Sequence, residues 1–313
     1  MARIVITSRL IPEALEVLDG APHEVFYRDD PSPMPRAELL DVASRADALV
    51  SSLADRIDAE LFHAAPSLKV VANVAVGLDN IDLEQAAAQK VAICNTPGVL
   101  DASTADVAMF LMLAARRRTT DREAELRASR WEGWGIAENL ALDLSGSVLC
   151  LVGYGRIARA VARRARAFDM NVLHHTRHDT GEDGWVADLA ALAAAADVLS
   201  IHVPFAPETT GLISASVLGA MKSSAVVVNT ARGAVLDEEA LADALEGGRL
   251  FGAGLDVYQG EPAVNPRLLS APHAVLLPHI GSATVNTRRV MCELALRSVL
   301  SVLDGQTPSN RAR

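Results

Sequence analysis

The sequence contains few aromatic residues, few cysteines and no excess of positive charge. Only 4% of its 313 residues are aromatic, three are cysteines, and the formal net charge is −10. Cys94, Cys150 and Cys292 are far apart, and two of them lie inside apolar runs, so we expect reduced core residues rather than a disulfide or a metal set. An acidic chain lacks the basic footprint that a phosphate backbone requires, so we expect no nucleic-acid partner.

Long hydrophobic runs are absent as well. No apolar stretch approaches the length of a bilayer span without a charge or a turn, so we expect no membrane association. The opening residues Met-Ala-Arg-Ile-Val-Ile enter a predicted strand directly, which predicts a cytoplasmic protein without a signal peptide. The chain is instead 50% hydrophobic and rich in Ala, Leu and Val. This composition is typical of an α/β protein, and the length allows two domains with cores of their own.

Short apolar strands alternate with helical patterns along the chain, in two successive halves. The strands predicted in the first half are Ile4–Thr7, His23–Tyr27, Ala48–Ser51, Val70–Ala72 and Val91–Cys94. The strands predicted in the second half are Val148–Val152, Asn171–His175, Val198–His202, Ala225–Asn229, Gly252–Asp256 and Ala274–Leu277. We expect each half to form a doubly wound parallel sheet, flavodoxin-like in the first half and of the Rossmann type in the second.

The turn residues Asn95-Thr96-Pro97-Gly98 mark the crossing between the halves. The last predicted helix, Thr284–Leu303, is long and amphipathic, so it can return to pack on the first half. We therefore expect a substrate domain of residues 1–98 plus 285–313, a dinucleotide-binding domain of residues 99–284, and a cleft between them.

The segment after this crossing predicts a buried helix followed by a loop that contacts a partner subunit. Thr104–Arg117 predicts a helix that is nearly all apolar from Val107 to Ala115, so we expect it to be buried on most sides and to lie between the two domains. Trp131 and Trp134 then fall in a glycine-containing loop. Two tryptophans in such a loop are more often covered by a partner surface than left in water, so we expect an association of subunits here.

The stretch Val148–Ala158 contains a strand, a G-x-G-x-x-A turn and the start of a helix. Gly153 permits the tight turn, Gly155 lets the backbone approach a pyrophosphate, and Ala158 lets the helix pack closely on the strand. A glycine turn without a ligand is the alternative. The strand and helix on either side of the turn favour a dinucleotide.

Three further polar residues follow consecutive strands of the second half: Arg232, Glu261 and His279. In an open α/β sheet the ligand lies beyond the carboxyl ends of the strands, which is where these residues fall. A guanidinium binds a carboxylate through two parallel hydrogen bonds, and an imidazole oriented by a carboxylate transfers protons near neutral pH. Any one of the three alone is better explained by a surface turn, a loop or the end of a strand, but the set favours chemistry on a hydroxy or keto acid.

The end of the strand Asn171–His175 predicts the choice of nicotinamide cofactor. An NAD-binding unit usually has Asp or Glu there to accept from the ribose hydroxyls, but this chain continues with Thr176 and Arg177. A hydroxyl and a guanidinium suit a 2′-phosphate, so we expect NADP(H) in preference to NAD(H). His174 and His175 are adjacent on a strand and point to opposite faces, so we expect no metal site.

Several motifs, in order along almost the whole chain, resemble those of the D-isomer-specific 2-hydroxyacid dehydrogenase family. Besides the glycine turn they are Val76–Asp82, Asn95–Leu100, Asn229–Gly233, Gly254–Val257 and Pro278–Gly281. Within the family the chain most resembles glyoxylate/hydroxypyruvate reductases, through Trp131–Trp134, His279–Thr284 and the end of the strand Asn171–His175.

The resemblance implies roles for particular residues. Arg232, Glu261 and His279 would be the catalytic trio. The substrate would meet the backbone N–H groups of Val76 and Gly77, the side chains of Arg232 and His279, and a pocket lined by Leu53. The implied cofactor contacts are Thr104, Gly153, Tyr154, Gly155, Arg156, Ile157, Thr176, Arg177, Val203, Pro204, Thr209, Thr230, Ala231, Asp256 (near the nicotinamide carboxamide) and Gly281.

The resemblance also implies a homodimer, in which Trp134 either reaches the partner's active site or packs in the interface. We expect an enzyme that uses NADPH to reduce a small 2-keto acid, glyoxylate or hydroxypyruvate, to the D-2-hydroxy acid. The alternatives are a dehydrogenase for a bulkier acid, such as 2-ketogluconate or 3-phosphoglycerate, and a dinucleotide-sensing protein similar to the corepressors of this fold.

Overall fold

The computed structural model describes residues 1–312. It divides the chain into two compact units: a first unit of Met1–Leu100 with Ser282–Arg313, and a second unit of Asp101–Gly281. The predicted α/β class is confirmed, because each unit contains one sheet in which every strand pair is parallel.

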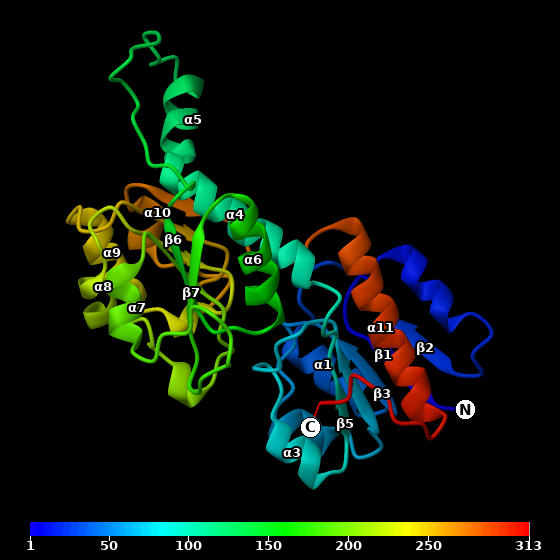
Figure 1. The fold of residues 1–313 in the computed structure, drawn as a ribbon. Coiled ribbons are helices and arrows are strands. Elements are labelled where there is room, and N and C mark those ends of the chain that lie inside the picture. Colours follow the sequence, from blue (N-terminus) through cyan, green and yellow to red (C-terminus); the bar gives the residue numbers. More distant parts are fainter. Residues whose placement is uncertain (313) are drawn as a thin grey trace. The chain divides into compact units, whose positions relative to one another are not determined.

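The first unit is built on a five-stranded sheet in the order β2-β1-β3-β4-β5. Its strands are β1 (Arg3–Ile6), β2 (Glu24–Tyr27), β3 (Ala48–Ser51), β4 (Val70–Asn73) and β5 (Ala92–Cys94). Its helices are η1 (Pro12–Leu18), α1 (Arg36–Ala43), α2 (Ala59–Ala64), α3 (Leu83–Ala88) and α11 (Val285–Leu303). α1, α2 and α3 cover one face of the sheet, and η1 and α11 cover the other (Figure 1).

Alternating side chains of each strand serve these two layers. Val5, Leu49 and Val71 pack under α1, α2 and α3, whereas Ile4 and Val50 pack under α11. All five are essentially inaccessible to solvent. A strand covered on both faces needs apolar residues at successive positions, which explains the near-continuous apolar runs in the sequence.

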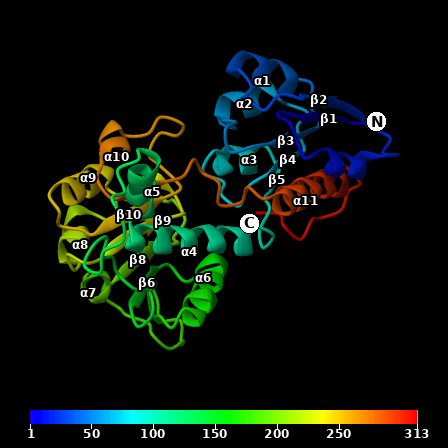
Figure 2. The same ribbon diagram turned by 90° about the horizontal axis from the view of Figure 1, so that it is seen from above.

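The second unit contains a six-stranded sheet in the order β11-β10-β9-β8-β6-β7. Its strands are β6 (Val148–Val152), β7 (Asn171–His175), β8 (Val198–Ile201), β9 (Val226–Asn229), β10 (Gly252–Leu255) and β11 (Ala274–Leu276). Its helices are α4 (Asp101–Arg117), α5 (Thr119–Arg127), α6 (Arg156–Ala167), α7 (Leu189–Ala195), η2 (Pro207–Thr209), α8 (Ala215–Ala220), η3 (Gly233–Val235), α9 (Glu238–Glu246) and α10 (Pro266–Ser270). α4 and α6 cover one face, and α7, α8, α9 and α10 the other (Figure 2).

Two local features differ from the sequence expectations. α4 begins at Asp101 rather than Thr104, so the helix starts earlier than predicted. Most of α4 is buried, as expected, although Phe110 and Leu113 are exposed. A parallel bridge between His174 and Trp185 also extends the sheet beyond β7. Its partner segment is too short and polar to be recognised as a strand.

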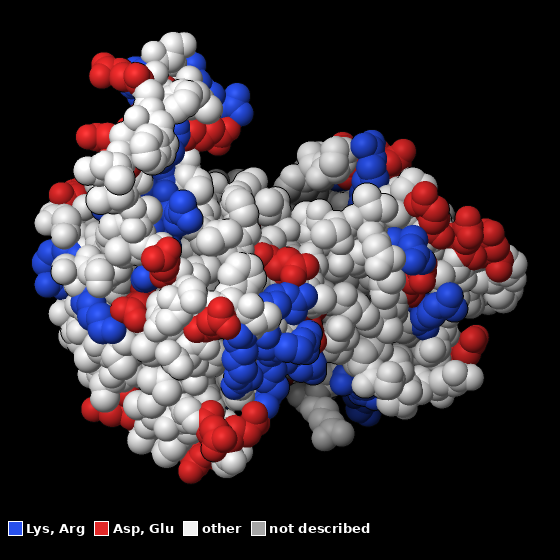
Figure 3. Space-filling model, turned by 45° about the horizontal axis from the view of Figure 1, so that its top comes forward, with Lys and Arg blue, Asp and Glu red and all other residues white. Residues whose placement is uncertain are grey.

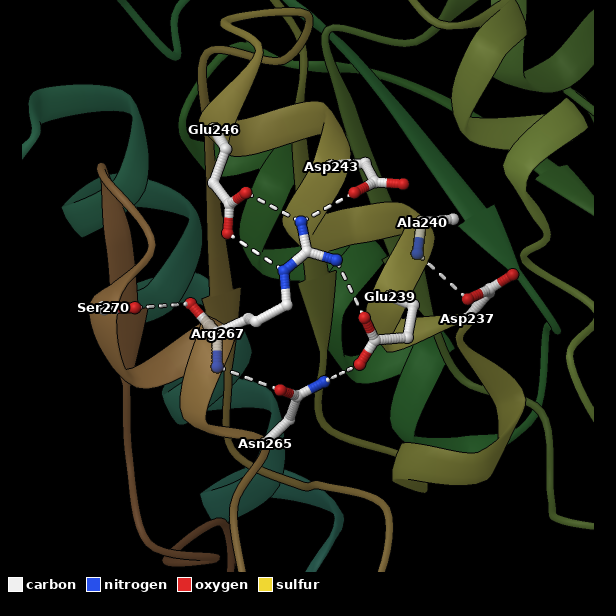
Figure 4. A network of polar contacts seen from close by, with 8 residues as sticks. All are labelled: Asp237, Glu239, Ala240, Asp243, Glu246, Asn265, Arg267 and Ser270. Carbon is white, nitrogen blue, oxygen red and sulfur yellow. Dashed lines mark hydrogen bonds and ion pairs between the residues drawn. The ribbon is translucent and has the colours of Figure 1, made fainter.

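A network of ion pairs connects α10 to α9 in the second unit. The guanidinium of Arg267 contacts the carboxylates of Glu239 at 2.8 Å, Asp243 at 2.6 Å and Glu246 at 2.7 Å (Figure 4). Asn265 accepts from the Arg267 N–H at 2.9 Å and so caps α10. The network lies in solvent, where screening weakens each pair, so it orients the short helix more than it stabilises the unit.

None of the helices among residues 1–312 is long and apolar enough to cross a bilayer. Across the same residues, no group of three or more histidine, cysteine, aspartate and glutamate side chains has the placement of a metal site.

Candidate active site

The glycine turn lies at the switch point of the second sheet, where β6 has β7 on one side and β8 on the other. Gly153 has φ of +91°, and a Cβ there would lie 2.7 Å from His202 O and 2.9 Å from Val203 Cγ1. Glycine is therefore required for this approach of the two strand ends. Gly155 is the N-cap of α6, and no side chain caps that end of the helix. The backbone N–H groups of the first turn of α6 therefore have no side-chain acceptor and can bind an anion.

The helix that begins at this turn is basic although the chain is acidic. Its arginines are Arg156, Arg159, Arg163, Arg164 and Arg166. Figure 3 shows Lys and Arg side chains gathered over this helix. The Arg159 guanidinium lies 4.6 Å from the ring centroid of Tyr154 and pairs with Glu182. Positive charge beside the turn favours the phosphate groups of a dinucleotide.

At the end of β7, the predicted residues for a 2′-phosphate follow the strand directly. Arg177 is exposed, and Thr176 is half-buried. The Thr176 hydroxyl donates to His178 O at 2.6 Å, so it would have to rotate before it could donate to a phosphate. His174 is fully buried, whereas the partly buried His175 donates from Nδ1 to Val186 O at 3.0 Å.

Arg232 lies in the turn after β9, and its backbone is held by Asn229. The Asn229 side chain donates to Arg232 O at 2.9 Å and accepts from Ala231 N at 3.0 Å. Gly233 packs directly on the chain after β10, because a Cβ there would lie 1.9 Å from the carbonyl carbon of Tyr258. The turn that presents the guanidinium is therefore set by backbone packing as well as by a side-chain amide.

Glu261 and His279 form a hydrogen-bonded pair. Glu261 Oε2 lies 2.6 Å from His279 Nδ1, and Oε1 accepts from Tyr258 N at 2.8 Å. Burial raises the pKa of Glu261, but the hydrogen bonds from His279 and Tyr258, with the nearby charge of Arg232, outweigh it and hold that pKa below its ordinary value. A carboxylate on Nδ1 fixes the tautomer and leaves Nε2 for proton transfer.

The turn that carries His279 is built on Asp256. His279 has φ of +54°, a left-handed conformation that costs a non-glycine residue energy and is typical of functional sites. The two Asp256 oxygens accept from the N–H groups of Ile280 and Gly281, each at 2.7 Å. Burial raises the pKa of Asp256, and these two N–H groups oppose that shift. The Asp256 carboxylate thus fixes the backbone of the turn that carries His279.

The remaining predicted cofactor residues surround the same sheet edge. A Cβ at Gly281 would lie 3.1 Å from Asp256 Oδ2 and 3.4 Å from Thr104 Cγ2, so these three residues are neighbours. The Thr209 hydroxyl donates to Pro204 O at 2.7 Å, which shapes the loop after β8. Thr230 Oγ1 is buried and has no hydrogen-bond partner among the described residues, so a bound polar group could satisfy it. These features fit a dinucleotide.

The other predicted substrate residues do not belong to the strand ends of the second sheet. Leu53, Val76 and Gly77 belong to the first unit, in the turns after β3 and β4. Trp134 lies in the loop after α5 and is 83% exposed. Figure 1 shows α5 and this loop projecting from the second unit.

Two residues with evident roles in the second unit were missed by sequence reasoning. Asn229 was noticed within a motif but not assigned the role of bracing Arg232. Glu238 is buried and accepts from Gln259 N at 2.6 Å; burial raises its pKa. An acidic residue in the first turn of a helix is usually a solvated cap, so no sequence signal marked it.

The fold and this side-chain set together define an oxidoreductase with an NAD(P)-binding unit. The family model described as "D-isomer specific 2-hydroxyacid dehydrogenase, NAD binding domain" matches residues 109–281. A glyoxylate reductase of Thermococcus litoralis is 40% identical over 316 residues, which cover 98% of this chain and 95% of that protein. The chain belongs to the D-isomer-specific 2-hydroxyacid dehydrogenase family.

Two crystal structures extend the comparison. A Thermus thermophilus protein is 43% identical with a TM-score of 0.94, over 99% of this chain and 100% of that one. An NADPH-dependent glyoxylate/hydroxypyruvate reductase from Sinorhizobium meliloti, in complex with NADP and malonate, is 34% identical with a TM-score of 0.87, over 99% and 96% of the two chains.

Proposed function

We propose that this protein reduces a small 2-keto acid, glyoxylate or hydroxypyruvate, to the D-2-hydroxy acid, with NADPH as the preferred cofactor. The observation that carries the proposal is the Glu261–His279 pair, at 2.6 Å, at the carboxyl edge of the sheet that also presents Arg232. Full-length relatives at about 40% identity carry the name glyoxylate reductase, which supports the same reaction.

The roles of the three side chains follow from their chemistry. Bound NADPH supplies the hydride that reduces the keto carbon. His279 Nε2 donates a proton to the keto oxygen, and Glu261 keeps the ring oriented and balances its charge. Arg232 binds the substrate carboxylate and polarises the keto oxygen. On the first unit, we assign the N–H groups of Val76 and Gly77 as further carboxylate donors and Leu53 as a pocket wall.

The preference for NADPH rests on the end of β7. No carboxylate occupies the position directly after the strand, and Arg177 is exposed there. A guanidinium binds a dianionic phosphate through charge-assisted hydrogen bonds, whereas it gains little from a ribose hydroxyl. The related structure with bound NADP supports this assignment, and NAD(H) remains a weaker alternative substrate.

We also propose a homodimer formed through the arm surface. The arm surface consists of the exposed apolar residues of α4, α5 and the following loop: Phe110, Leu113, Leu126, Trp131, Trp134, Ile136 and Leu140. An exposed apolar surface of this kind is typical of an interface.

The three cysteines are free and buried, which fits the reducing cytoplasm.

The deciding experiment follows NADPH absorbance with purified protein and a panel of glyoxylate, hydroxypyruvate, 2-ketogluconate and the oxidised form of 3-phosphoglycerate. We expect the highest kcat/KM with glyoxylate or hydroxypyruvate. A preference for either bulkier acid would contradict the small-acid assignment. NADPH binding without turnover of any of the four would instead identify a dinucleotide-sensing protein.

The dimer has its own test in sedimentation velocity. Trp131→Ala combined with Trp134→Ala should shift the protein from dimer to monomer, whereas Leu269→Ala, an exposed leucine elsewhere on the second unit, should leave the dimer intact. In a Trp134→Ala variant that remains dimeric, a raised KM for the keto acid assigns Trp134 to the partner's pocket, and an unchanged KM assigns it to packing.

A further inference from the structure

We propose that the side-chain amide of Asn80 is a positioning residue that links the turn carrying Leu53 to the turn carrying Val76 and Gly77. It thereby sets how the pocket wall faces the carboxylate donors. This inference rests on the proposed function, because it assigns a role to a residue beneath the substrate-binding turns of the first unit.

The Asn80 amide contacts both turns at once. Its Nδ2 donates to Ser52 O at 3.0 Å and to Asp55 O at 2.9 Å, on either side of Leu53. Its Oδ1 accepts from Asn73 Nδ2 at 3.0 Å, and that same nitrogen donates to Gly77 O at 3.0 Å. Two side-chain amides therefore form one continuous connection between the two turns.

The turn after β3 is held rigidly at its base. The carboxylate of Asp55 is buried and accepts from Thr7 Oγ1 at 2.6 Å, Ser52 N at 2.7 Å and Ser52 Oγ at 3.1 Å. Three hydrogen bonds that converge on one oxygen of this buried carboxylate, Oδ2, favour a single arrangement of the turn. The Asn80 bonds to Ser52 O and Asp55 O attach the second turn to this fixed base.

In the turn after β4, three successive carbonyl groups are held. Ala75 O accepts from Thr96 N at 2.8 Å, Val76 O accepts from the Asn95 side chain at 2.8 Å, and Gly77 O accepts from Asn73. Because each peptide group is planar and trans, a held carbonyl also fixes the direction of the N–H that follows it. The N–H directions of Val76 and Gly77 are thus determined before any anion binds, which lowers the entropic cost of binding.

The backbone of Asn80 reinforces the same connection. Ile57 N donates to Asn80 O at 2.9 Å, and Asp82 N donates to Ile57 O at 2.8 Å. These bonds anchor the chain near position 80 independently of its side chain. Loss of the amide alone should therefore free the two turns from each other without unfolding the segment.

The test compares Asn80→Ala and the isosteric Asn80→Asp, which lacks the two N–H donors, with Asp82→Asn. The control residue caps α3 through Gln85 N at 3.0 Å and contacts neither turn through its side chain. We expect both Asn80 variants to raise KM for glyoxylate about tenfold, as expected for losing roughly one net hydrogen bond, with kcat changed much less. NADPH affinity should be unchanged, because the residue lies in the other unit. The Asp82 variant should keep its KM within about twofold of the wild-type value.

Hydrogen exchange gives a readout that does not depend on activity. In both Asn80 variants, peptides that cover residues 52–56 and 74–80 should lose protection together, and in the control they should not. An unchanged KM, or faster exchange confined to residues 78–82, would overturn the proposal. If the wild-type protein turned over none of the keto acids, the proposed function would fail, whereas joint loss of protection would still support the link between the turns.

Discussion

The phenol ring of Tyr154 stacks on the imidazole of His174, with ring centroids 3.8 Å apart and planes inclined by 15°. The pair joins the glycine turn after β6 to the neighbouring strand β7. His174 is fully buried and bonds Thr180 Oγ1 through Nε2 at 2.8 Å, while its Nδ1 has no partner among the described residues. The imidazole therefore supports the glycine turn by stacking under the ring of Tyr154.

Removal of this platform should destabilise the second unit. His174→Ala loses the stacking and leaves a cavity, so we expect the free energy of unfolding to fall by about 2–3 kcal/mol. Urea unfolding followed by tryptophan fluorescence measures this loss, because all three tryptophans, Trp131, Trp134 and Trp185, lie in the second unit. His178→Ala, an exposed histidine nearby, should change stability by less than about 0.5 kcal/mol.

The same histidine predicts a dependence of stability on pH. Burial lowers the pKa of His174 below its ordinary value of 6.5. Below pH 6.5, His174 is therefore protonated in the unfolded chain while it stays neutral in the folded chain. The free energy of unfolding that the neutral ring contributes is lost as the pH falls through the pKa of the folded state. His174→Phe keeps the stacking without the titration. Its stability relative to wild type should rise between pH 7 and pH 5; an unchanged difference would contradict this prediction.

Replacement of His279 should strongly lower turnover and leave cofactor binding intact. His279→Ala removes the proton donor, so we expect kcat for glyoxylate to fall by about 10²–10⁴ while the Kd of NADPH changes little. A matched control is His273→Ala, because His273 also bonds a carboxylate, Asp121, at 2.7 Å in the same unit. The control should keep most of its kcat. Comparable losses in the two variants would mean that the effect is structural.

Arg177 should discriminate between the two nicotinamide cofactors. Arg177→Ala removes the guanidinium assigned to the 2′-phosphate, so we expect KM for NADPH to rise at least tenfold and KM for NADH to change little. Steady-state kinetics with both cofactors measures the ratio. Arg163→Ala, on α6, should affect both cofactors equally and weakly. Equal effects of the Arg177 replacement on both would show that another group selects the cofactor.

Gly233 should tolerate no side chain. A Cβ there would lie 1.9 Å from Tyr258 C and 2.3 Å from Gln259 N, and neither backbone group can move without displacing the turn before Glu261. We expect Gly233→Ala to lower the free energy of unfolding by on the order of 3 kcal/mol and to reduce kcat. Gly219→Ala in α8 is the control, since its nearest neighbour would be the end of Arg249 at 3.7 Å and alanine favours a helix. That variant should be as stable as wild type or more so.

The local signals in the sequence determined much of this protein. Apolar runs ending at turn residues placed the strands, because a parallel sheet covered on both faces needs such runs, and both sheets follow the expected parallel pattern. The spacing of Gly153, Gly155 and Ala158 located the turn at the switch point, because few residue types fit its backbone. The residues after strands β9, β10 and β11 were found because all strands of a parallel sheet end at the same edge.

Other features depended on contacts between residues far apart in the sequence. Three such contacts have no local signature, because strand order brings each pair together. They are the hydrogen bonds from Ile280 and Gly281 to Asp256, the packing of Gly233 on Tyr258, and the stacking of Tyr154 on His174. The same holds for Asn80, whose amide would be an ordinary turn residue without the neighbouring β3 and β4 ends. Sequence determined which chemical groups meet at the sheet edge, and tertiary structure decided how rigidly and in which direction each is held.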